Sequence, residues 1–599
     1  MELEFLKRLK GILGQLASDK NTLIVLVLFL LTFIIKNVMF YYDIDSEDNP
    51  YKISATAIAL YFFIGLFIAS ISLFCKNKYG LILVSLLYDA WLLSNLWYFR
   101  CYNDLLTHWN LQCVGNMDGI WDSVLIYING ADFFYIAISV AFILVCVFLK
   151  CKAKHTVAAI ALTTASVLIS LPLINAQVNE LKKSPYIDIN KELTINVFDE
   201  NYNMPFYAWE VKGNGFYSIY FSPLMYFANQ FENCFSSSYQ NIDFSKEDFE
   251  KYISKPSDTE PQAEVPNVIV VLFESLEGWT INQKVGEHEI TPNLNKLIRS
   301  NNVFFTDNMV VQTTNGLSSD AQLLLNTGLS PILEGAVANR FFMNEFPSLC
   351  EASNLPNRKT FVPTAHTLWN QDKITKAYDY NELFAHVCSY KTLFSNVEKY
   401  IDSTVNEGFF VQVATMASHT PFDAFSDSSL LKTSEKALPP MLDKYIKSVN
   451  YTDASLALII EKIMNDDRYA NTILVVMGDH AVFPDETRAK FRQFFKLNNF
   501  GSGFTELNVG SWHVPFIVYS KMIQGNIYFG GESYQMDTYS TLLSLINKNY
   551  YWNGLGLNLL EKRDAGRIYS SSDASAISDK LINGNFFRQY KKILKYGNN

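Results

Sequence analysis

Charged residues are scarce in this sequence, and basic residues are not in excess. Asp, Glu, Lys and Arg together make up 18% of the 599 residues, against about 25% in typical soluble proteins. The formal net charge is −10, so the basic signature of a nucleic-acid-binding protein is missing. We therefore expect no nucleic-acid partner. The low charge indicates a very apolar region beside an ordinary globular domain.

Cysteine pairs are also missing. None of the eight cysteines forms a Cys-x-x-Cys pair, which argues against a zinc knuckle. The sequence contains no internal repeat either.

Long apolar runs are concentrated in the first 176 residues. Most are close to the roughly 20 residues that a membrane-spanning helix needs, although the fourth is the shortest and has Asp132 at its edge. Because further apolar runs follow the first directly, we do not expect a cleaved signal peptide. Five buried helices of a soluble protein are the alternative. We predict a membrane domain over residues 1–176 with five transmembrane helices: Asn21–Phe40, Ile53–Cys75, Tyr79–Phe99, Phe133–Leu149 and Thr156–Ala176.

Basic residues predict the orientation of these helices. Lys and Arg accumulate before the first run, between the second and third, and between the fourth and fifth, whereas the alternate loops are acidic. Since short cytoplasmic loops carry the excess of Lys and Arg, the N-terminus is predicted inside and everything after Ala176 outside. Cys101 and Cys113 then share an outside loop, where a disulfide is chemically permitted. Free buried cysteines are the alternative.

Residues 177–261 are predicted to form a juxtamembrane linker. Phe216–Phe235 is strongly aromatic and is interrupted by Ser222-Pro223. It is typical either of a segment at the membrane interface or of a helix packed on the globular domain. Ser254–Pro266 is rich in proline and acidic residues, which indicates a linker.

The remaining residues, 262–599, are predicted to form one catalytic domain with a C-terminal tail. Asn267–Phe273 and Thr472–Met477 are continuous apolar runs rich in β-branched residues, typical of strands buried on both faces. Phe409–Ala414 and Val514–Tyr519 are further candidate strands, and Met441–Met464 has apolar residues at helical spacing. Strands alternating with helices predict an α/β fold with a mostly parallel sheet.

Polar residues follow two of these strands. Glu274 comes directly after the first strand, and Asp479 and His480 come after the strand Thr472–Met477 and Gly478. Ligands of open α/β sheets bind beyond the carboxyl ends of the strands. Two carboxylates and an imidazole form a plausible site for one divalent cation, with Mn²⁺ preferred and Zn²⁺ or Mg²⁺ as alternatives. Taken singly, each residue could also be a strand-end cap.

A glycine turn leads into a helix within Thr313–Leu325. Ser319 and Gln322 have the spacing of a capping box, so the serines could serve only as caps. Alternatively, a hydroxyl at this helix N-terminus faces backbone N–H groups that suit a phosphate or sulfate. A bound metal would lower the pKa of such a hydroxyl and make it a nucleophile.

Three histidines of the same domain are candidates for substrate binding. His366, His419 and His513 lie in aromatic or polar surroundings. Each could equally be an ordinary core histidine.

Several stretches occur in one order: NVIVVLFESLEGW, TPNLNKL, the Ser318 turn, WNQD, SHTPF, GDH and HVPFIVYS. Together they resemble the sulfatase-like group of the alkaline phosphatase superfamily, and within it the lipoteichoic acid synthases. The resemblance covers nearly the whole chain, because those phosphoglycerol transferases also have five N-terminal spans before an extracellular domain.

The resemblance implies roles for individual residues. Glu274, Asp479 and His480 match the metal ligands. Ser318 matches the nucleophile, a threonine in that family, whose oxygen also meets the metal. His366, Trp369 and His419 resemble residues that line the phosphoglycerol site, and His419 is in addition a candidate general acid. The family's FWNRD stretch reads LWNQD here, so that Gln371 replaces an arginine, the usual bidentate partner of a phosphate.

The implied function is transfer of a phosphoglycerol-type head group from a membrane phospholipid to a glycan or polymer hydroxyl. It would be performed by a multi-pass protein of the cell membrane whose catalytic domain is extracytoplasmic. Phosphoethanolamine transfer is an alternative. Arylsulfatase chemistry is another, although no Cys-x-Pro-x-Arg stretch is present. The non-enzymatic alternative is an inactive binding ectodomain.

Overall fold

The computed structural model divides the chain into two compact units, which are treated separately. One comprises residues 1–108 and 124–236, and the other comprises residues 109–123 and 237–599. The residues described are 19–43, 55–73, 79–102, 125, 127–149, 156–181, 242–253, 265–314, 316–332, 335–422, 431, 438–483, 485–497, 512–561 and 569–596.

The described part of the first unit is helical. Three of its helices are long and apolar enough to cross a membrane, over Lys20–Phe40, Tyr79–Arg100 and Gly130–Phe148. Two shorter apolar helices cover Ile58–Ser70 and Thr156–Ser170. Each of the five predicted spans thus overlaps a helix, but only three stretches of the described residues are both long and apolar enough to count as candidate spans. The helices are α2 (Lys20–Asp43), α3 (Ala55–Ser72), α4 (Tyr79–Tyr102), α7 (Phe133–Phe148) and α8 (Thr156–Leu181), with η2 (Gly130–Asp132) before α7.

Buried ion pairs join the helices of this unit. Lys36 of α2 contacts both Asp89 of α4 and Ser139 of α7, and all three side chains are buried. Arg100 of α4 holds Asp132 with two bonds, of 2.8 and 2.9 Å. A charge in apolar surroundings is costly unless it is paired, so these contacts tie the helices together at defined positions.

The second unit is built on a nine-stranded sheet with the order β10-β4-β9-β8-β1-β7-β5-β6, in which β11 pairs with β4. A short hairpin of β2 (Lys284–Val285) and β3 (His288–Glu289) lies apart from it. The strands of the large sheet are β1 (Asn267–Phe273), β4 (Val303–Val310), β5 (Asn357–Val362), β6 (Glu382–Ala385), β7 (Phe409–Ala414), β8 (Thr472–Gly478), β9 (His513–Tyr519), β10 (Asn526–Tyr528) and β11 (Ser533–Tyr534).

The sheet is mixed. Strand β9 runs antiparallel to both of its neighbours, β4 and β8, whereas the other pairings in this sheet are parallel. The prediction of a mostly parallel sheet is therefore confirmed, with β9 as the described exception. As a consequence, β9 begins at the edge where its neighbours end.

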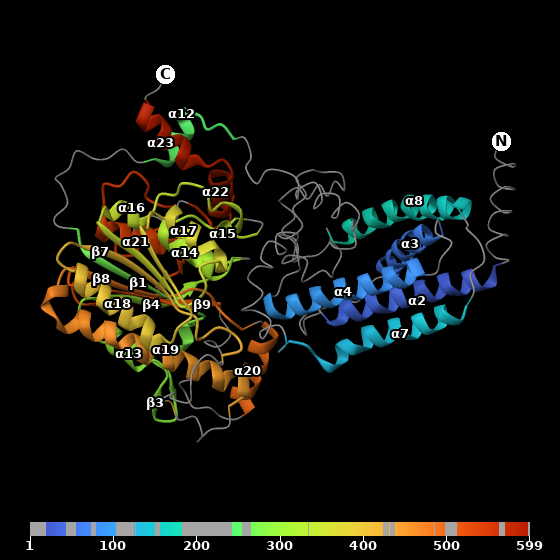
Figure 1. The fold of residues 1–599 in the computed structure, drawn as a ribbon, viewed down its shortest axis with the longest axis horizontal. Helices are drawn as coiled ribbons and strands as arrows, with labels where there is room; N and C mark the ends of the chain where they lie inside the picture. The colour runs from blue at the N-terminus through green and yellow to red at the C-terminus, as the bar shows by residue number, and fades with distance from the viewer. Residues whose placement is uncertain are drawn as a thin grey trace. The chain divides into compact units, whose positions relative to one another are not determined.

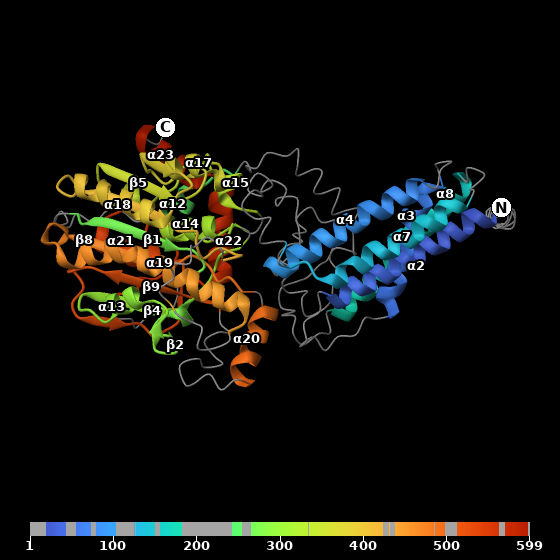
Figure 2. The ribbon, with the colours of Figure 1, turned by 60° about the horizontal axis from the view of Figure 1, so that its bottom comes forward.

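Helices cover both faces of the sheet, because its central strands are apolar on both sides (Figure 1 and Figure 2). Along β1, Val268, Val270 and Leu272 belong to one hydrophobic core, and Ile269, Val271 and Phe273 belong to the other. The first core includes residues of α14 (Ser318–Thr327), α16 (Leu349–Ser353), α17 (Gln371–Ala377), α21 (Asp537–Ile546), α22 (Ser571–Asn583) and α23 (Phe586–Tyr596). The second includes residues of α13 (Pro292–Ile298), α18 (Tyr390–Thr404), α19 (Pro440–Asn465) and α20 (Asp485–Leu497).

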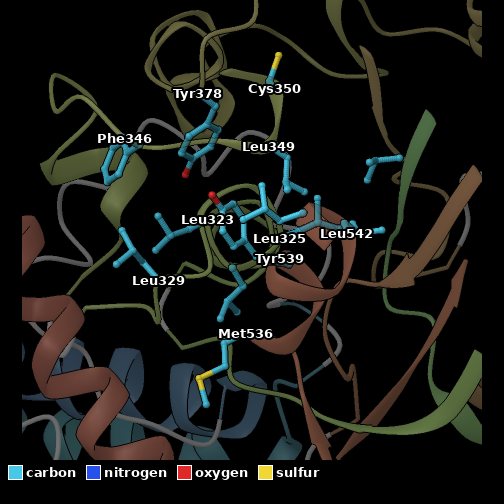
Figure 3. Close-up of a cluster of buried hydrophobic side chains, with 14 of the residues drawn as sticks. Leu323, Leu325, Leu329, Phe346, Leu349, Cys350, Tyr378, Met536, Tyr539 and Leu542 are labelled. Carbon is cyan, nitrogen blue, oxygen red and sulfur yellow. The ribbon is translucent and has the colours of Figure 1, made fainter. Parts of the chain in front are cut away.

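The first core fixes the helix that carries Ser318. Leu323, Leu325 and Leu329 lie beside Tyr539 and Leu542 of α21 in Figure 3. All of these side chains are buried, and burial of each leucine contributes roughly 1.5–3 kcal/mol. Helix α14 is therefore held firmly against the sheet.

Part of the predicted linker is folded onto the second unit. Helix α12 (Lys246–Tyr252) places Phe249 against Phe586 of α23, with ring centroids 4.8 Å apart. Gln589 of α23 donates to the carbonyl of Ile242 at 2.7 Å. The predicted interfacial segment Phe216–Phe235, most of Ser254–Pro266, and the side chains of Cys101 and Cys113 lie outside the described residues.

Candidate metal and nucleophile site

One edge of the sheet collects the polar residues predicted for the site. Glu274 follows β1, Asp479 and His480 follow β8, and the segment after β4 leads to Ser318. Strands β1, β4 and β8 all end at this edge because they run in the same direction. Strand β7 also ends there, and the segment that follows it contains His419. Sheet direction alone therefore brings together residues that lie up to 206 positions apart in the chain.

The three predicted metal ligands form a compact cluster. Ligand atoms of Glu274, Asp479 and His480 all lie within 4.8 Å of one another, and all three residues are buried. His480 Nε2 is 3.3 Å from Glu274 Oε1 and 3.7 Å from Asp479 Oδ2. Two carboxylates and one imidazole nitrogen aimed at one point are a suitable donor set for Mn²⁺, Zn²⁺ or Mg²⁺.

Neighbouring groups hold these ligands in orientation. The backbone N–H of Ser275 and that of His480 both donate to Asp479 Oδ1, each at 2.7 Å. The second ring nitrogen of His480, Nδ1, lies 3.1 Å from the carbonyl oxygen of Ala481. If Nδ1 carries the proton and donates to that oxygen, the lone pair of Nε2 is free for a metal.

Ser318 begins α14 and points at the cluster. Its Oγ donates to Glu274 Oε2 at 3.1 Å and lies 3.3 Å from His480 Nε2. The preceding residue, Leu317, has a φ of 41°, a conformation that costs free energy in a non-glycine residue. The chain therefore turns sharply just before the hydroxyl, as a nucleophile presented at a helix N-terminus requires.

The predicted capping box is wrong. The N-cap position of α14 is occupied by Leu317 and has no side-chain cap bond. Ser319 Oγ instead donates to the carbonyl of Gly316 at 2.8 Å. The turn is held by Asp320, whose Oδ2 accepts from the N–H groups of Thr314 and Gly316 at 2.9 and 3.0 Å. Thus the Asp320 carboxylate, which accepts from backbone N–H groups earlier in the chain, takes the place of the predicted serine cap, whose partner would lie later in the chain.

Two glycines make these close approaches possible. A Cβ on Gly316 would stand 2.1 Å from Asp320 Oδ1, and one on Gly478 would stand 2.2 Å from the carbonyl oxygen of Leu276. Either contact is far shorter than a van der Waals separation. Gly478 therefore lets the turn after β1 pass directly over the end of β8, which brings Glu274 to Asp479.

The cluster holds more buried acid than one imidazole can neutralise. Burial, followed by the charge of Glu274, raises the pKa of Asp479 to about 7. Burial alone would raise the pKa of Glu274 as well, but His480 outweighs it and the pKa falls to about 2. Burial lowers the pKa of His480, yet the two carboxylates raise it to about 10. A divalent cation fits this unbalanced donor set.

The other predicted site residues differ in placement. His419 is half-buried, its charge lowers the pKa of Glu274, and its Nδ1 lies 2.7 Å from the Thr420 carbonyl oxygen. His513 begins β9 at the same edge. Its buried Nδ1 has no hydrogen-bond partner among the described residues, and burial, then Arg488, lowers its pKa. Both residues thus lie at the edge where β1 and β8 end.

His366 and Trp369 follow β5. His366 is exposed, and no hydrogen bond or ion pair within the described ranges joins it to Ser318 or to the three ligands. Trp369 is half-buried against the first core, in η5 (Leu368–Asn370). Gln371, which starts α17, is 3% exposed, and its Oε1 has no hydrogen-bond partner within the described part of the chain. A buried amide thus stands where the resemblance expects a guanidinium.

Sequence reasoning missed the residues that support the site. Thr415 Oγ1 accepts from the N–H of Glu274 at 2.9 Å, and Ser418 Oγ donates to the Glu274 carbonyl at 2.5 Å. Gln535 Nε2 donates to the Asp479 carbonyl at 2.6 Å. Only Ser418 lay in a stretch singled out beforehand. Single polar residues of this kind carry no spacing signal in a sequence.

Two family models match this chain. The family model described as Sulfatase matches residues 266–548. The model described as Lipoteichoic acid synthase N-terminal domain matches residues 6–212. The two matches cover different parts of the chain, one for each kind of domain.

Similar curated proteins extend over nearly the full length. Lipoteichoic acid synthase 2 of Bacillus subtilis is 24% identical over 595 residues, which cover 88% of this chain and 87% of that protein. Lipoteichoic acid synthase of Staphylococcus aureus is 22% identical over 611 residues, with coverage of 91% and 89%.

One solved structure is similar in fold over both units. It is the integral membrane protein lipooligosaccharide phosphoethanolamine transferase A from Neisseria meningitidis, with a TM-score of 0.51 and 12% identity. The match covers 88% of this chain and 96% of that chain. The chain is therefore a membrane protein that joins a lipoteichoic acid synthase N-terminal domain to a Sulfatase domain of alkaline phosphatase-like α/β fold, and its homologues are lipoteichoic acid synthases.

Proposed function

We propose that this protein transfers a phosphoglycerol-type head group from a membrane phospholipid to a hydroxyl of a glycan or polymer. The observation that carries the proposal is the position of Ser318 Oγ, which lies 3.1 Å from Glu274 and 3.3 Å from His480 within the ligand cluster. Lipoteichoic acid synthases as full-length relatives support a transferase rather than a hydrolase.

The residues divide into ligands and reacting groups. Glu274, Asp479, His480 and the Ser318 oxygen would hold one divalent metal ion, preferably Mn²⁺, with Zn²⁺ or Mg²⁺ as alternatives. That ion would act as a Lewis acid, which lowers the pKa of the serine hydroxyl and stabilises charge on the phosphoryl oxygens.

The reaction has two displacements. In the first, Ser318 Oγ forms a bond to phosphorus, the bond from phosphorus to the diacylglycerol oxygen breaks, and diacylglycerol leaves with a proton. In the second, an acceptor hydroxyl displaces the serine oxygen, which regains a proton. His419, when protonated on both ring nitrogens, would donate the Nε2 proton to the leaving oxygen or bind the phosphoryl group, since its Nδ1 faces the Thr420 carbonyl and leaves Nε2 for the substrate.

The head-group subsite is assigned to His366, Trp369, His419 and His513. His419 and His513 lie at the ligand edge, and Trp369 packs beside α17. Phosphoethanolamine is the second candidate head group. It is favoured by the neutral Gln371 at the position where the resemblance expects an arginine.

For the membrane, we propose five spans over residues 1–176, with the N-terminus inside and the domain of residues 262–599 outside the cell membrane. The alternation of Lys-rich and acidic loops supports this orientation. A catalytic domain outside the membrane would meet lipid head groups at the outer surface. Protease added to intact spheroplasts should release a fragment that starts within residues 177–265, and a fully protected C-terminal half would contradict the topology.

The deciding experiment supplies detergent-solubilised protein with phospholipids that differ only in head group, and follows diacylglycerol release in the presence of Mn²⁺. Release from phosphatidylglycerol, with a phosphoglycerol adduct on the Ser318 peptide by mass spectrometry, is the expected result. Preferential release from phosphatidylethanolamine would favour the second candidate. An adduct on Thr313, Thr314 or Ser319 with Ser318 unmodified would show that the nucleophile is assigned wrongly.

A further inference from the structure

A second charged pair lies directly behind the ligand cluster. Glu277 follows Glu274 by three residues in the turn after β1, and Arg488 is on α20, beyond the Asp479–His480 turn. Both side chains are completely buried. The guanidinium meets both carboxylate oxygens, with Nη2 on Oε1 and Nη1 on Oε2 at 3.1 Å. This is a fork-to-fork contact between the turn that carries Glu274 and helix α20, which follows the Asp479–His480 turn.

The pair also holds the backbone that follows the ligands. Glu277 Oε1 accepts from the N–H of Val482 at 2.9 Å, and Arg488 Nε donates to the carbonyl of Phe483 at 2.7 Å. Glu277 Oε2 accepts in addition from Trp279 Nε1 at 2.6 Å. The backbone of Val482 and Phe483, just after His480, is thus held by hydrogen bonds to both side chains of the ion pair.

A buried tyrosine connects this clamp to the ligands themselves. Tyr445 of α19 donates to the Ser275 carbonyl at 2.8 Å and accepts from the Glu277 N–H at 3.1 Å. Ser275, in turn, donates to Asp479 Oδ1. A continuous set of hydrogen bonds therefore runs from the ion pair to one of the metal ligands.

Electrostatics explain why such a clamp would be needed. Glu274 and Asp479 are two carboxylates within 4.8 Å of each other that share one imidazole, His480, so the turns that carry them need support from outside the cluster. A buried ion pair contributes little net stability, since well-packed apolar residues often do as well or better. The pair lies beside the ligand turns rather than among the strands, which matches a role in setting the distance between the metal ligands.

We infer that the Glu277–Arg488 ion pair is a positioning pair that keeps the Glu274 turn and the Asp479–His480 turn at the separation a divalent cation needs. The inference rests on the metal site proposed above. Neither residue is one of the proposed metal ligands, so both act through the backbone that they hold.

The test measures binding of Mn²⁺ alone to full-length, detergent-solubilised protein by isothermal titration calorimetry. Glu277→Gln keeps the shape of the side chain and removes its charge, and Arg488→Met keeps much of the length and removes the fork. We expect the Kd for Mn²⁺ to rise tenfold or more in each, as when groups that orient metal ligands are lost. Arg488→Lys, which restores the charge without the fork, should recover part of the affinity.

Loss of stability alone must be separated from loss of positioning. Val397→Ala removes buried volume from α18 in the second core, so it should lower the unfolding temperature while leaving the Kd for Mn²⁺ within about twofold. The double variant Glu277→Gln/Arg488→Met leaves no unpaired buried charge, and we expect it to bind Mn²⁺ as weakly as the single variants because the pair acts as one unit. Wild-type affinity in the folded double variant would overturn the inference. Failure of the wild-type protein to bind Mn²⁺ would instead overturn the proposed metal site.

Discussion

The helical unit and the ligand edge of the sheet differ in how their buried charges are neutralised. In the helical unit, Lys36 is met by Asp89 and Arg100 by Asp132, so each buried charge has a partner on another element. At the edge of the sheet, Glu274 and Asp479 share the single imidazole of His480. A region meant to lie in lipid must neutralise its charges from within its own chain. The edge of the sheet leaves an excess of negative charge for a cation to satisfy.

The largest expected effect concerns the Ser318 hydroxyl, which contacts both Glu274 and His480. Ser318→Ala removes the attacking oxygen, so turnover should fall to background while the unfolding temperature stays close to that of the wild type. Ser318→Thr keeps a hydroxyl at the same place and should retain part of the activity. Diacylglycerol release measures both variants. Near-normal release by Ser318→Ala would refute the assigned nucleophile.

Removing one carboxylate from the cluster of Glu274, Asp479 and His480 tests whether that cluster carries an excess of negative charge. Asp479→Ala takes away one of two repelling carboxylates, so the metal-free protein should remain folded with unchanged or higher stability. Binding of Mn²⁺ and turnover should both be lost, because one of three ligands is missing. Calorimetric titration and thermal unfolding in chelator test this. Full activity of Asp479→Ala in chelator would contradict the metal site.

The same substitution in the balanced unit should have the opposite effect on stability. Asp89→Ala leaves the Lys36 ammonium buried without its carboxylate partner, which we expect to cost about 3–5 kcal/mol. The double variant Lys36→Met/Asp89→Ala leaves no charge behind and serves as the control. Thermal unfolding in detergent reports the difference, and equal stability of the single and double variants would show that the pair is not balanced in this way.

A buried acid held by backbone groups gives a smaller, pH-dependent effect. Asp453 of α19 accepts from the N–H groups of Asn293 and Leu294 at the start of α13, yet burial outweighs these bonds and raises its pKa to about 6. The folded protein then binds a proton that the unfolded chain has released between pH 3.8 and 6. The contribution of Asp453 to stability is therefore greatest at low pH and is lost as pH rises to 6, by up to about 3 kcal/mol.

Asp453→Asn isolates this contribution, because the amide cannot titrate. Chemical denaturation of the two proteins from pH 4 to 7 should show that the difference in free energy of unfolding changes with pH in favour of the variant. A difference that is constant with pH would mean that the backbone donors keep Asp453 at its ordinary pKa.

The smallest expected effect is at Ser319. Its hydroxyl makes one hydrogen bond to the Gly316 carbonyl, so Ser319→Ala should cost about 1 kcal/mol. Activity should remain measurable, which makes this variant the matched control for Ser318→Ala. A loss of activity equal to that of Ser318→Ala would mean that the turn, rather than the nucleophile, is being tested.

Local patterns predicted the buried elements well. The strand predicted at Asn267–Phe273 has the same bounds as β1, and the helix predicted at Met441–Met464 differs from α19 by one residue at each end. Both have long, unambiguous apolar patterns. The strands β4, β5, β6, β10 and β11 were missed, because their apolar patterns are short or interrupted by polar residues. The antiparallel direction of β9 could not be predicted either, since the direction of a strand depends on which strands it pairs with.

The sequence by itself determined the apolar helices, the central strands and the ligands that follow them, because burial on both faces and the chemistry of carboxylates and imidazoles are local properties of the chain. Only the tertiary structure decided that Ser318 faces those ligands, that Asp320 rather than Ser319 holds its turn, and that Glu277 meets Arg488 from 211 residues away. These contacts arise where strands from distant parts of the sequence end at one edge of the sheet. Which side chains meet there depends on how the strands are arranged in the sheet, and the spacing of residues along the chain does not show that arrangement.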